Sequence, residues 1–308
     1  MQALAIVDRG SSPELHDVAV PHPAAGEVLV AVEAASVNGA DAGMVAGMLW
    51  DHIPHTFPVV VGRDFAGTVT AVGHGVNGVA VGDLVAGVLP AMGRLGPGTF
   101  GEFVVAPARA VAAIPAGMAT TTAAAVGLAG IAALDVLDAA GVDDGDVVVI
   151  SGATGGVGHY AVQLAARRGA TVIATTTPGE EALLRSLGAA HTVDYTGDLA
   201  AQLRAVAPEG VDEVIHTAGD PATVAAALRQ GGTLASTVGA TAQQIGRDDV
   251  EVVAVFNAPT AKKLTTLLSQ VVDGTLRPQL SATVPFERAG DALAAFLVGN
   301  VGKVVVTR

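Results

Sequence analysis

The chain has 308 residues, of which 51% are hydrophobic and 15% are charged. Two domains are expected at this length, and the apolar content argues against intrinsic disorder. A formal net charge of −13 argues against nucleic acid or an anionic membrane as a partner. The absence of cysteine excludes disulfides, thiolate zinc sites and cysteine nucleophiles.

The N-terminal sequence contains no basic segment followed by a long apolar core, so no secretory signal is predicted. No apolar run is predicted to be long and uninterrupted enough to span a membrane. A soluble, cytoplasmic protein is therefore expected.

Residues 1 to about 117 contain short β-branched runs separated by Gly- and Pro-rich turns. Short, evenly spaced strands are typical of a partly open barrel rather than of a parallel sheet. Strands are predicted at Gln2–Asp8, Glu27–Ala35, Gly67–Val72, Leu84–Val88 and Gly101–Pro107.

From Thr120 onward helices and strands alternate, a pattern that predicts a βαβ array with a parallel sheet. The predicted helices are Thr120–Ala140, His159–Arg168, Glu180–Leu187, Leu199–Ala207 and Pro221–Arg229. The predicted strands are Val147–Ile150, Thr171–Thr177, Thr192–Asp194, Val211–Thr217, Gly232–Val238 and Val250–Phe256. Helices at Thr260–Asp273 and Phe286–Val298 and a strand at Lys303–Thr307 follow, and the pattern alone does not assign them to either domain.

A glycine-rich turn lies between the strand Val147–Ile150 and the helix His159–Arg168. Glycine is frequent in this chain, so the cluster alone is a weak signal. The order of strand, turn, helix and second strand makes dinucleotide binding the better interpretation, because a pyrophosphate needs close approach to backbone N–H groups at a helix start. The turn residues assigned to this role are Ala153, Thr154, Gly155, Gly156, Val157 and Gly158.

Three groups of segments carry a resemblance to a known family. They are Ala35-Ser36-Val37-Asn38-Gly39-Ala40-Asp41 with Gly62-Arg63-Asp64-Phe65-Ala66-Gly67, then Gly98-Thr99-Phe100-Gly101-Glu102-Phe103, and then the glycine turn continued by Val162-Gln163-Leu164-Ala165 with Leu187-Gly188-Ala189. Together they resemble the medium-chain dehydrogenase/reductase superfamily and, within it, the zinc-free NADPH:quinone oxidoreductase branch related to zeta-crystallin. The resemblance implies an α/β protein with a GroES-like β-barrel catalytic domain (residues 1–117 and 259–308). A Rossmann doubly wound parallel-sheet domain (118–258) is inserted into it.

No metal is predicted. In the zinc alcohol dehydrogenase branch, a Cys stands near position 38 and a His-Glu pair stands at positions 63 and 64. This chain has Asn38, Arg63 and Asp64, and of these Asn is a poor zinc ligand and Arg is none. The loop 51–55 contains two histidines and an aspartate, but such loop histidines are usually solvated. Without a Lewis acid to stabilise an alkoxide, reduction of a conjugated acceptor is favoured over alcohol oxidation.

NADPH is predicted as the cofactor. An acidic residue about 20 positions after the turn would hold the ribose of NAD. Here the position falls at Thr176, flanked by Thr175 and Thr177, with no carboxylate to repel a 2′-phosphate. The resemblance also implies a Ser and a Lys just downstream, which are missing, and a Tyr after the next strand, which Tyr195 matches. Arg185 either compensates for the missing residues or faces solvent.

The resemblance implies that Asn38 and Asp41 are the catalytic residues beside the nicotinamide. Asn38 is the candidate for hydrogen-bonding the acceptor or the nicotinamide ribose. Further cofactor contacts implied by the family are Val126, Thr217, Gly239, Ala240, Phe256 and Asn257.

A roomy apolar substrate pocket is expected from Gly43, Met44, Leu49 and Trp50. Relatives commonly carry tyrosines at or near two of these positions, so the usual phenol proton donors are missing. Ordinary packing is as good an interpretation for Trp50, and core or lining packing is favoured for Met44.

The resulting prediction is a zinc-independent, NADPH-dependent reductase that transfers hydride to a quinone. Reduction of an enone or enoyl double bond is the alternative, and a non-catalytic NADPH-binding sensor or structural protein is a second one. A homodimer is expected from the family, through an exposed edge strand at Val250–Phe256.

Overall fold

The computed structural model describes residues 1–48, 50–90 and 96–308. The chain forms two compact units, one of residues 1–131 and 258–308 and the other of residues 132–257. The sequence placed these boundaries near 118 and 259. The long helix α2 (Thr120–Ala140) accounts for the first difference, because its residues are divided between the two units.

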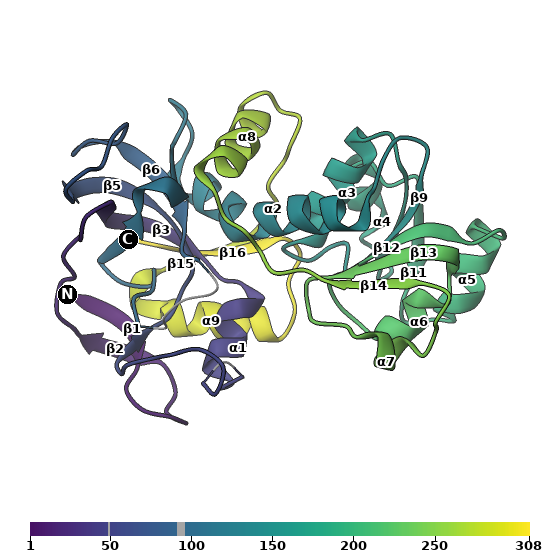
Figure 1. Ribbon diagram of the computed structural model, residues 1–308, viewed down its shortest axis with the longest axis horizontal. Helices are drawn as coiled ribbons and strands as arrows, with labels where there is room; N and C mark the ends of the chain where they lie inside the picture. The colour runs from purple at the N-terminus through teal and green to yellow at the C-terminus, as the bar shows by residue number, and fades with distance from the viewer. Residues whose placement is uncertain (49, 91–95) are drawn as a thin grey trace. The chain divides into compact units, whose positions relative to one another are not determined.

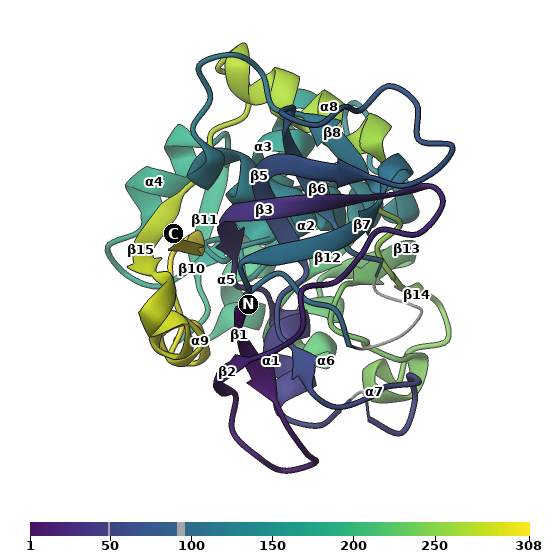
Figure 2. The same cartoon turned by 90° about the vertical axis from the view of Figure 1, so that its left-hand side faces the viewer.

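The first unit is built on a largely antiparallel sheet in the order β15-β16-β3-β5-β6-β8, with β7 also pairing with β3. Figure 2 shows β3 flanked by β5 and β7. A smaller sheet has the order β2-β1-β4. The strands are β1 (Gln2–Ile6), β2 (Glu14–Asp17), β3 (Glu27–Ser36), β4 (Val59–Val60), β5 (Asp64–Val72), β6 (Leu84–Val88), β7 (Phe103–Pro107), β8 (Val111–Ala113), β15 (Leu280–Pro285) and β16 (Lys303–Thr307).

The core of this unit follows from strand alternation. Val28, Val30 and Val32 recur at every second position of β3 and are buried in one apolar cluster, as expected of one face of a strand. Phe65 and Phe100 fill the same cluster. The helices are α1 (Gly39–Val45), α8 (Ala261–Val272) and α9 (Ala289–Leu297), with 3-10 turns η1 (Ala108–Ala110) and η2 (Phe286–Arg288).

The C-terminal strand returns to the first unit, where β16 runs antiparallel to β3 and pairs Val305 with Ser36. The N–H of Val37 donates to the carbonyl of Val304, 2.9 Å away. This pairing brings Lys303 beside the residues that follow β3.

The second unit is a six-stranded parallel sheet in the order β11-β10-β9-β12-β13-β14. Helices α3 and α4 lie on one face and α5, α6 and α7 on the other (Figure 1). The strands are β9 (Val147–Ser151), β10 (Thr171–Thr176), β11 (His191–Asp194), β12 (Val211–His216), β13 (Leu228–Ser236) and β14 (Glu251–Ala254). The helices are α3 (Gly158–Arg167), α4 (Glu181–Ser186), α5 (Leu199–Val206), α6 (Pro221–Ala225) and α7 (Ala242–Ile245). The prediction of a doubly wound α/β fold with a separate β-rich unit is confirmed.

Several short elements were not predicted, namely α1, α7, β2, β4 and β8. The helix predicted at Pro221–Arg229 ends at Ala225, and β13 begins at Leu228 rather than at Gly232. The β12–β13 ladder is irregular near this point, and Gly231 adopts φ +79°. The glycines therefore mark an irregularity inside a strand rather than the loop that precedes it.

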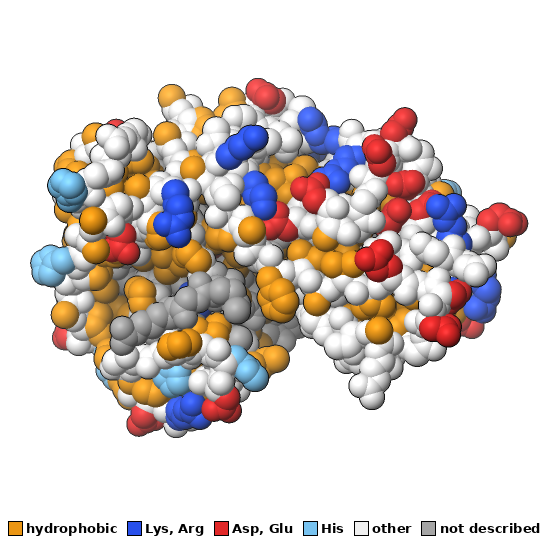
Figure 3. All heavy atoms as spheres, viewed as in Figure 1, with side chains coloured by type: hydrophobic (Ala, Val, Ile, Leu, Met, Phe, Trp, Pro, Cys, Tyr) orange, Lys and Arg blue, Asp and Glu red, His pale blue; other side chains and the backbone are white. Residues whose placement is uncertain are grey.

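The helix α2 is long and apolar enough to cross a membrane by length and composition, contrary to the sequence expectation. However, 78% of its most apolar window is buried inside the protein, which is typical of a core helix. On the face drawn in Figure 3 the second unit carries acidic and basic side chains interspersed, unlike the basic stripe of a nucleic-acid-binding surface.

Candidate cofactor and active site

The glycine turn connects β9 to α3 in the second unit. Gly152 adopts φ +72°, and a Cβ added there would lie 2.6 Å from Oγ1 of Thr217. A Cβ on Gly158 would overlap the carbonyl oxygen of Gly152 and lie 2.7 Å from Cα of Ala153. The turn therefore needs glycine at both of these positions. The sequence analysis assigned Gly158 to the turn but did not name Gly152.

The turn presents donors suited to an anion. Among the described residues, the N–H groups of Gly156 and Val157 donate to no protein acceptor, and they precede the ten-residue helix α3. Unpaired N–H groups at a helix start, together with the helix dipole, attract a phosphate. The residues present thus fit the pyrophosphate of a dinucleotide.

The end of β10 continues the site. Oγ1 of Thr175 accepts a hydrogen bond of 3.0 Å from the N–H of Gly152, which joins this strand to the turn. Thr176 is buried, and its Oγ1 lies 3.5 Å from Oε2 of Glu180. The sequence argument for NADPH assumed that no carboxylate lies at Thr176. That premise is wrong, because the chain folds back after β10 and brings Glu180 to it.

The other residues named for the adenosine end lie near the surface. Arg185 is exposed and donates to Oγ1 of Thr192 at 3.3 Å, so its guanidinium is directed at β11. Tyr195 follows β11 directly and is 53% exposed. Thr177 is half-buried, and its carbonyl accepts the hydroxyl of Thr176.

The loops after β12 and β13 are linked by a buried histidine that the sequence analysis missed. His216 Nδ1 lies 3.0 Å from Oγ of Ser236, and its Nε2 lies 3.1 Å from the carbonyl of Gly219. Ser236 Oγ in turn accepts N–H groups of Val238 and Ala240. The Gly219 carbonyl can only accept, so Nε2 carries the proton and Nδ1 accepts from Ser236.

Three predicted cofactor contacts are placed by these loops. The hydroxyl of Thr217 donates to the carbonyl of Ser151 at 2.6 Å, so it ties β12 to β9. Gly239 adopts φ +80°, and Ala240 is buried beside it. Val126 is buried in α2, whereas Phe256 is 75% exposed. Their contacts with a cofactor, and that of Asn257, stay predictions.

The first unit contains a buried polar network centred on Asn38. Its Oδ1 accepts from Nζ of Lys303 at 2.6 Å, and its Nδ2 donates to Oδ2 of Asp64 and to the carbonyl of Ser36, both at 3.0 Å. Asp64 also accepts from the N–H and Oγ of Ser36 and from the N–H of Leu128. Both hydrogens of Nδ2 are engaged, and Oδ1 accepts one bond and keeps a second lone pair. The predicted contact of Asn38 with substrate or cofactor stays a prediction.

Asp41 lies beside this network at the start of α1. Its Oδ2 accepts from the N–H of Asn38 at 2.8 Å, while its Oδ1 is buried with no hydrogen-bond partner among the described residues. Burial and the charge of Asp64 raise the pKa of Asp41 to about 7. Burial also lowers the pKa of Lys303, against the opposing charges of Asp64 and Asp41. A proton on Asp41 is therefore favoured in the folded protein.

This shift predicts a pH-dependent stability. The folded state binds the Asp41 proton more tightly than the unfolded chain, so the contribution is full below pH about 4 and is lost as pH rises through about 7. Asp41→Asn removes it. We expect the melting temperature of this variant, relative to the unmodified protein, to rise steadily between pH 5 and pH 8.

The control for this experiment is Asp248→Asn, which changes an exposed carboxylate of the second unit. Its melting temperature should follow that of the unmodified protein at every pH. Parallel curves for Asp41→Asn and the unmodified protein would contradict the assignment.

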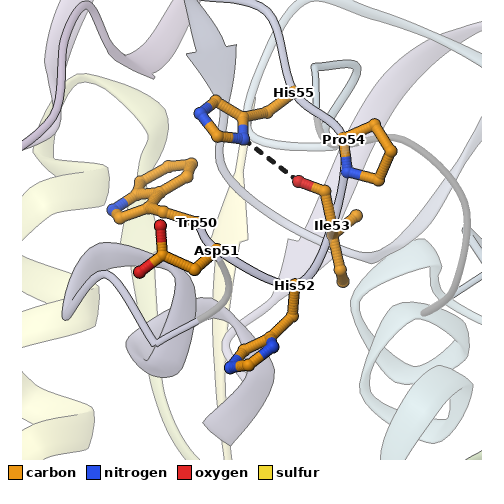
Figure 4. Close-up of a pocket in the computed structure, with 6 residues that line it drawn as sticks. All are labelled: Trp50, Asp51, His52, Ile53, Pro54 and His55. Carbon is orange, nitrogen blue, oxygen red and sulfur yellow. Dashed lines mark hydrogen bonds between the residues drawn. The ribbon is translucent and has the colours of Figure 1, made fainter.

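Of the four residues predicted for a substrate pocket, the structure places one at a pocket. Figure 4 shows this pocket, lined by residues 50–55. Trp50 is buried, and its ring is tilted against those of His55 and Phe57. Met44 is 1% exposed and packs in the core of the first unit, because it lies on the buried face of α1 with Asp41. Gly43 is half-buried near Met48, and Leu49 lies outside the described residues.

Comparison with known proteins places these features in one family. Residues 24–116 match the model of the alcohol dehydrogenase GroES-like domain, and residues 156–272 match that of the zinc-binding dehydrogenase. The chain is 33% identical over 305 residues to the chloroplast envelope quinone oxidoreductase homolog of Arabidopsis thaliana, covering 94% of this chain and 92% of that protein. The chain belongs to the quinone oxidoreductase-like branch of the medium-chain dehydrogenase/reductase superfamily.

Two further proteins of known activity or structure are similar to this chain. The 2-methylene-furan-3-one reductase of Solanum lycopersicum is 31% identical over 317 residues, covering 99% of this chain and 79% of that protein. The solved quinone oxidoreductase from Coxiella burnetii superposes with a TM-score of 0.88 at 27% identity, covering 100% of this chain and 99% of the other. As a member of this superfamily the chain is an oxidoreductase that uses a nicotinamide cofactor.

The zinc implied by the name of the second family model does not fit the residues at positions 38, 63 and 64. The Asn38 oxygen that would ligate a metal accepts from Lys303, and Arg63 is a buried guanidinium that interacts electrostatically with Asp41. In the described part of the chain, the group of three side chains close enough to hold a metal is Asp146, Asp212 and Glu213 of the second unit. This group lies at the N-terminal edge of the sheet, at the opposite strand ends from the glycine turn.

Proposed function

We propose that the protein is a zinc-independent reductase that transfers a hydride from a reduced nicotinamide cofactor to a quinone. The observation that carries the proposal is the Lys303–Asn38–Asp64 network at the positions where the zinc branch has its ligands. An acceptor that is already conjugated does not need the Lewis acid that these positions lack. The quinone oxidoreductase relatives support the same acceptor class.

The roles of the chain in this reaction are binding and orientation. The N–H groups of Gly156 and Val157 would bind the pyrophosphate. Thr217 at the end of β12 and Ala240 in the loop after β13 would contact the rest of the cofactor, and hydrogen bonds to Ser151 and Ser236 hold these two residues in place. The cofactor, when bound, supplies the hydride. Lys303 and Asp64 fix the amide of Asn38, so a contact made by that amide would have a preset direction.

Reduction of an enone is the second candidate, and the relative named 2-methylene-furan-3-one reductase is the observation that favours it. Quinones and enones share a flat, conjugated carbonyl system. The described residues that line the Trp50 pocket contain no feature that would favour one of these two substrate classes over the other.

The cofactor, the oligomeric state and the location of the protein stay predictions. The expectation of NADPH loses support because Glu180 lies beside Thr176. A homodimer stays a prediction, for which β14 at the edge of the second unit's sheet offers unpaired backbone groups. A cytoplasmic location also stays a prediction.

The test is oxidation of both reduced cofactors by a panel of acceptors, using protein dialysed against a chelator. We expect turnover with benzoquinone, phenanthrenequinone or a cyclic enone, and negligible oxidation of ethanol or benzyl alcohol with the oxidised cofactors. Robust alcohol oxidation without reduction of any conjugated acceptor would overturn the proposal. It would also be overturned if the protein contained stoichiometric zinc before dialysis and lost its activity when the chelator removed that zinc.

A further inference from the structure

The ribose-binding end of the dinucleotide site is acidic. In a fold of this type the adenosine ribose lies at the end of the second strand, which here is Thr176 of β10. Glu180 places its Oε2 3.5 Å from Oγ1 of Thr176. Asp194 stands directly opposite Thr176 on β11, and Glu181 follows Glu180 at the start of α4. Two of these carboxylates are already engaged: Asp194 accepts from Thr196, and Glu181 from the N–H of Gly179.

Four of the six arginines in residues 132–257 are engaged by other groups of the chain. The other two, Arg167 and Arg204, stand in the last turns of α3 and α5. Residues 132–257 contain no lysine. Three of their arginines form ion pairs, with Arg168 on Asp138, Arg229 on Asp212 and Arg247 on Asp249. Arg185, the first arginine after β10 in sequence, donates to Thr192.

We infer that Glu180 is the specificity-determining residue for the cofactor and that the protein prefers NADH to NADPH, an inference that rests on the proposed use of a nicotinamide cofactor. In NAD-binding folds an acidic residue at the end of the second strand holds the ribose, and here Glu180 would fill that role from its position beside Thr176. Its carboxylate accepts a hydrogen bond from the ribose 2′-hydroxyl of NADH. The 2′-phosphate of NADPH meets the same carboxylate as a like charge and loses the hydroxyl donor.

The experiment is a fluorescence titration of the full chain with NADH and with NADPH at low salt. NADH should bind roughly tenfold or more tightly than NADPH, because the carboxylate and the 2′-phosphate carry like charges and repel each other. Glu180→Gln should bring the two dissociation constants within about threefold, and Glu180→Lys should reverse their order.

Glu209→Gln is the matched control. It removes the same charge from the same unit, but Glu209 is exposed ahead of β12, at the strand ends opposite to Thr176. Its preference ratio should equal that of the unmodified protein. The inference would be overturned if the unmodified protein bound NADPH more tightly than NADH. It would also be overturned if Glu180→Gln left the ratio of the two dissociation constants unchanged. If neither cofactor bound, the proposed function itself would be refuted.

Discussion

Gly158→Ala is expected to weaken the binding of the reduced cofactor strongly, measured as a rise in its dissociation constant. The added Cβ would overlap the carbonyl oxygen of Gly152 and lie 2.7 Å from Cα of Ala153, and both atoms belong to backbone that cannot rotate away. Overpacking of such a site costs about 1–3 kcal/mol or more. When the free turn relieves this strain by moving, cofactor binding must restore the turn, and the dissociation constant rises by up to roughly 5- to 150-fold. The measurement is the same titration with reduced cofactor, with circular dichroism to confirm that the variant is folded.

Substitutions at two other glycines, where an added Cβ meets less crowding, provide a series with smaller expected effects. A Cβ on Gly155 would lie 3.2 Å from the Gly152 oxygen, so Gly155→Ala should weaken binding less than Gly158→Ala does. A Cβ on Gly290, in α9 of the first unit, meets nothing within 4 Å, so Gly290→Ala should bind the cofactor normally. Equal affinity across all three variants would show that the turn does not hold the cofactor.

The turn could be predicted from sequence because all of its determinants are local. Val148, Val149 and Ile150 form a buried strand, and the turn residues follow without a gap. The resemblance then located the remaining cofactor and active-site candidates by position. The parallel sheet was predictable for the same reason, since each strand is a short apolar run between helices.

The residues that the sequence did not reveal depend on contacts between distant positions. Lys303 reaches Asn38 across 265 residues, and only the pairing of β16 with β3 creates that contact. The signal that could have suggested it is a lysine at the start of an otherwise apolar strand. Glu180 stands in the region where the resemblance implies a Ser and a Lys, but the sequence did not assign it to the ribose. Counting along a strand ignores a chain that folds back after the strand. Helix α1 was missed because its glycines resemble a loop.

Lys303→Met is expected to destabilise the first unit strongly. Lys303 is 2% exposed, and its Nζ donates to the carbonyl of Val37 at 2.7 Å and to Asn38 at 2.6 Å. Removing the ammonium leaves two buried acceptors without their donor and takes away the positive charge that acts on Asp64. Each unsatisfied buried acceptor costs about 1–3 kcal/mol, so a loss on the order of 2–6 kcal/mol is expected. Thermal unfolding of the variant and the unmodified protein gives the difference, and Arg288→Met is the control. It breaks an exposed ion pair of the same unit, for which about 0–1 kcal/mol is expected.

A double-mutant cycle separates the charge from the packing. Asp64→Asn alone leaves Lys303 unpaired and sets an amide donor among four groups that donate to Asp64, namely the N–H and Oγ of Ser36, Nδ2 of Asn38 and the N–H of Leu128. In the double variant neither charge is buried, so its loss of stability should be smaller than the sum of the two single losses. Additive losses would contradict an energetic coupling between Lys303 and Asp64. A large coupling would show that the two side chains stabilise each other in the folded protein. Turnover per folded molecule is expected to fall in both single variants, because each removes a partner of Asn38.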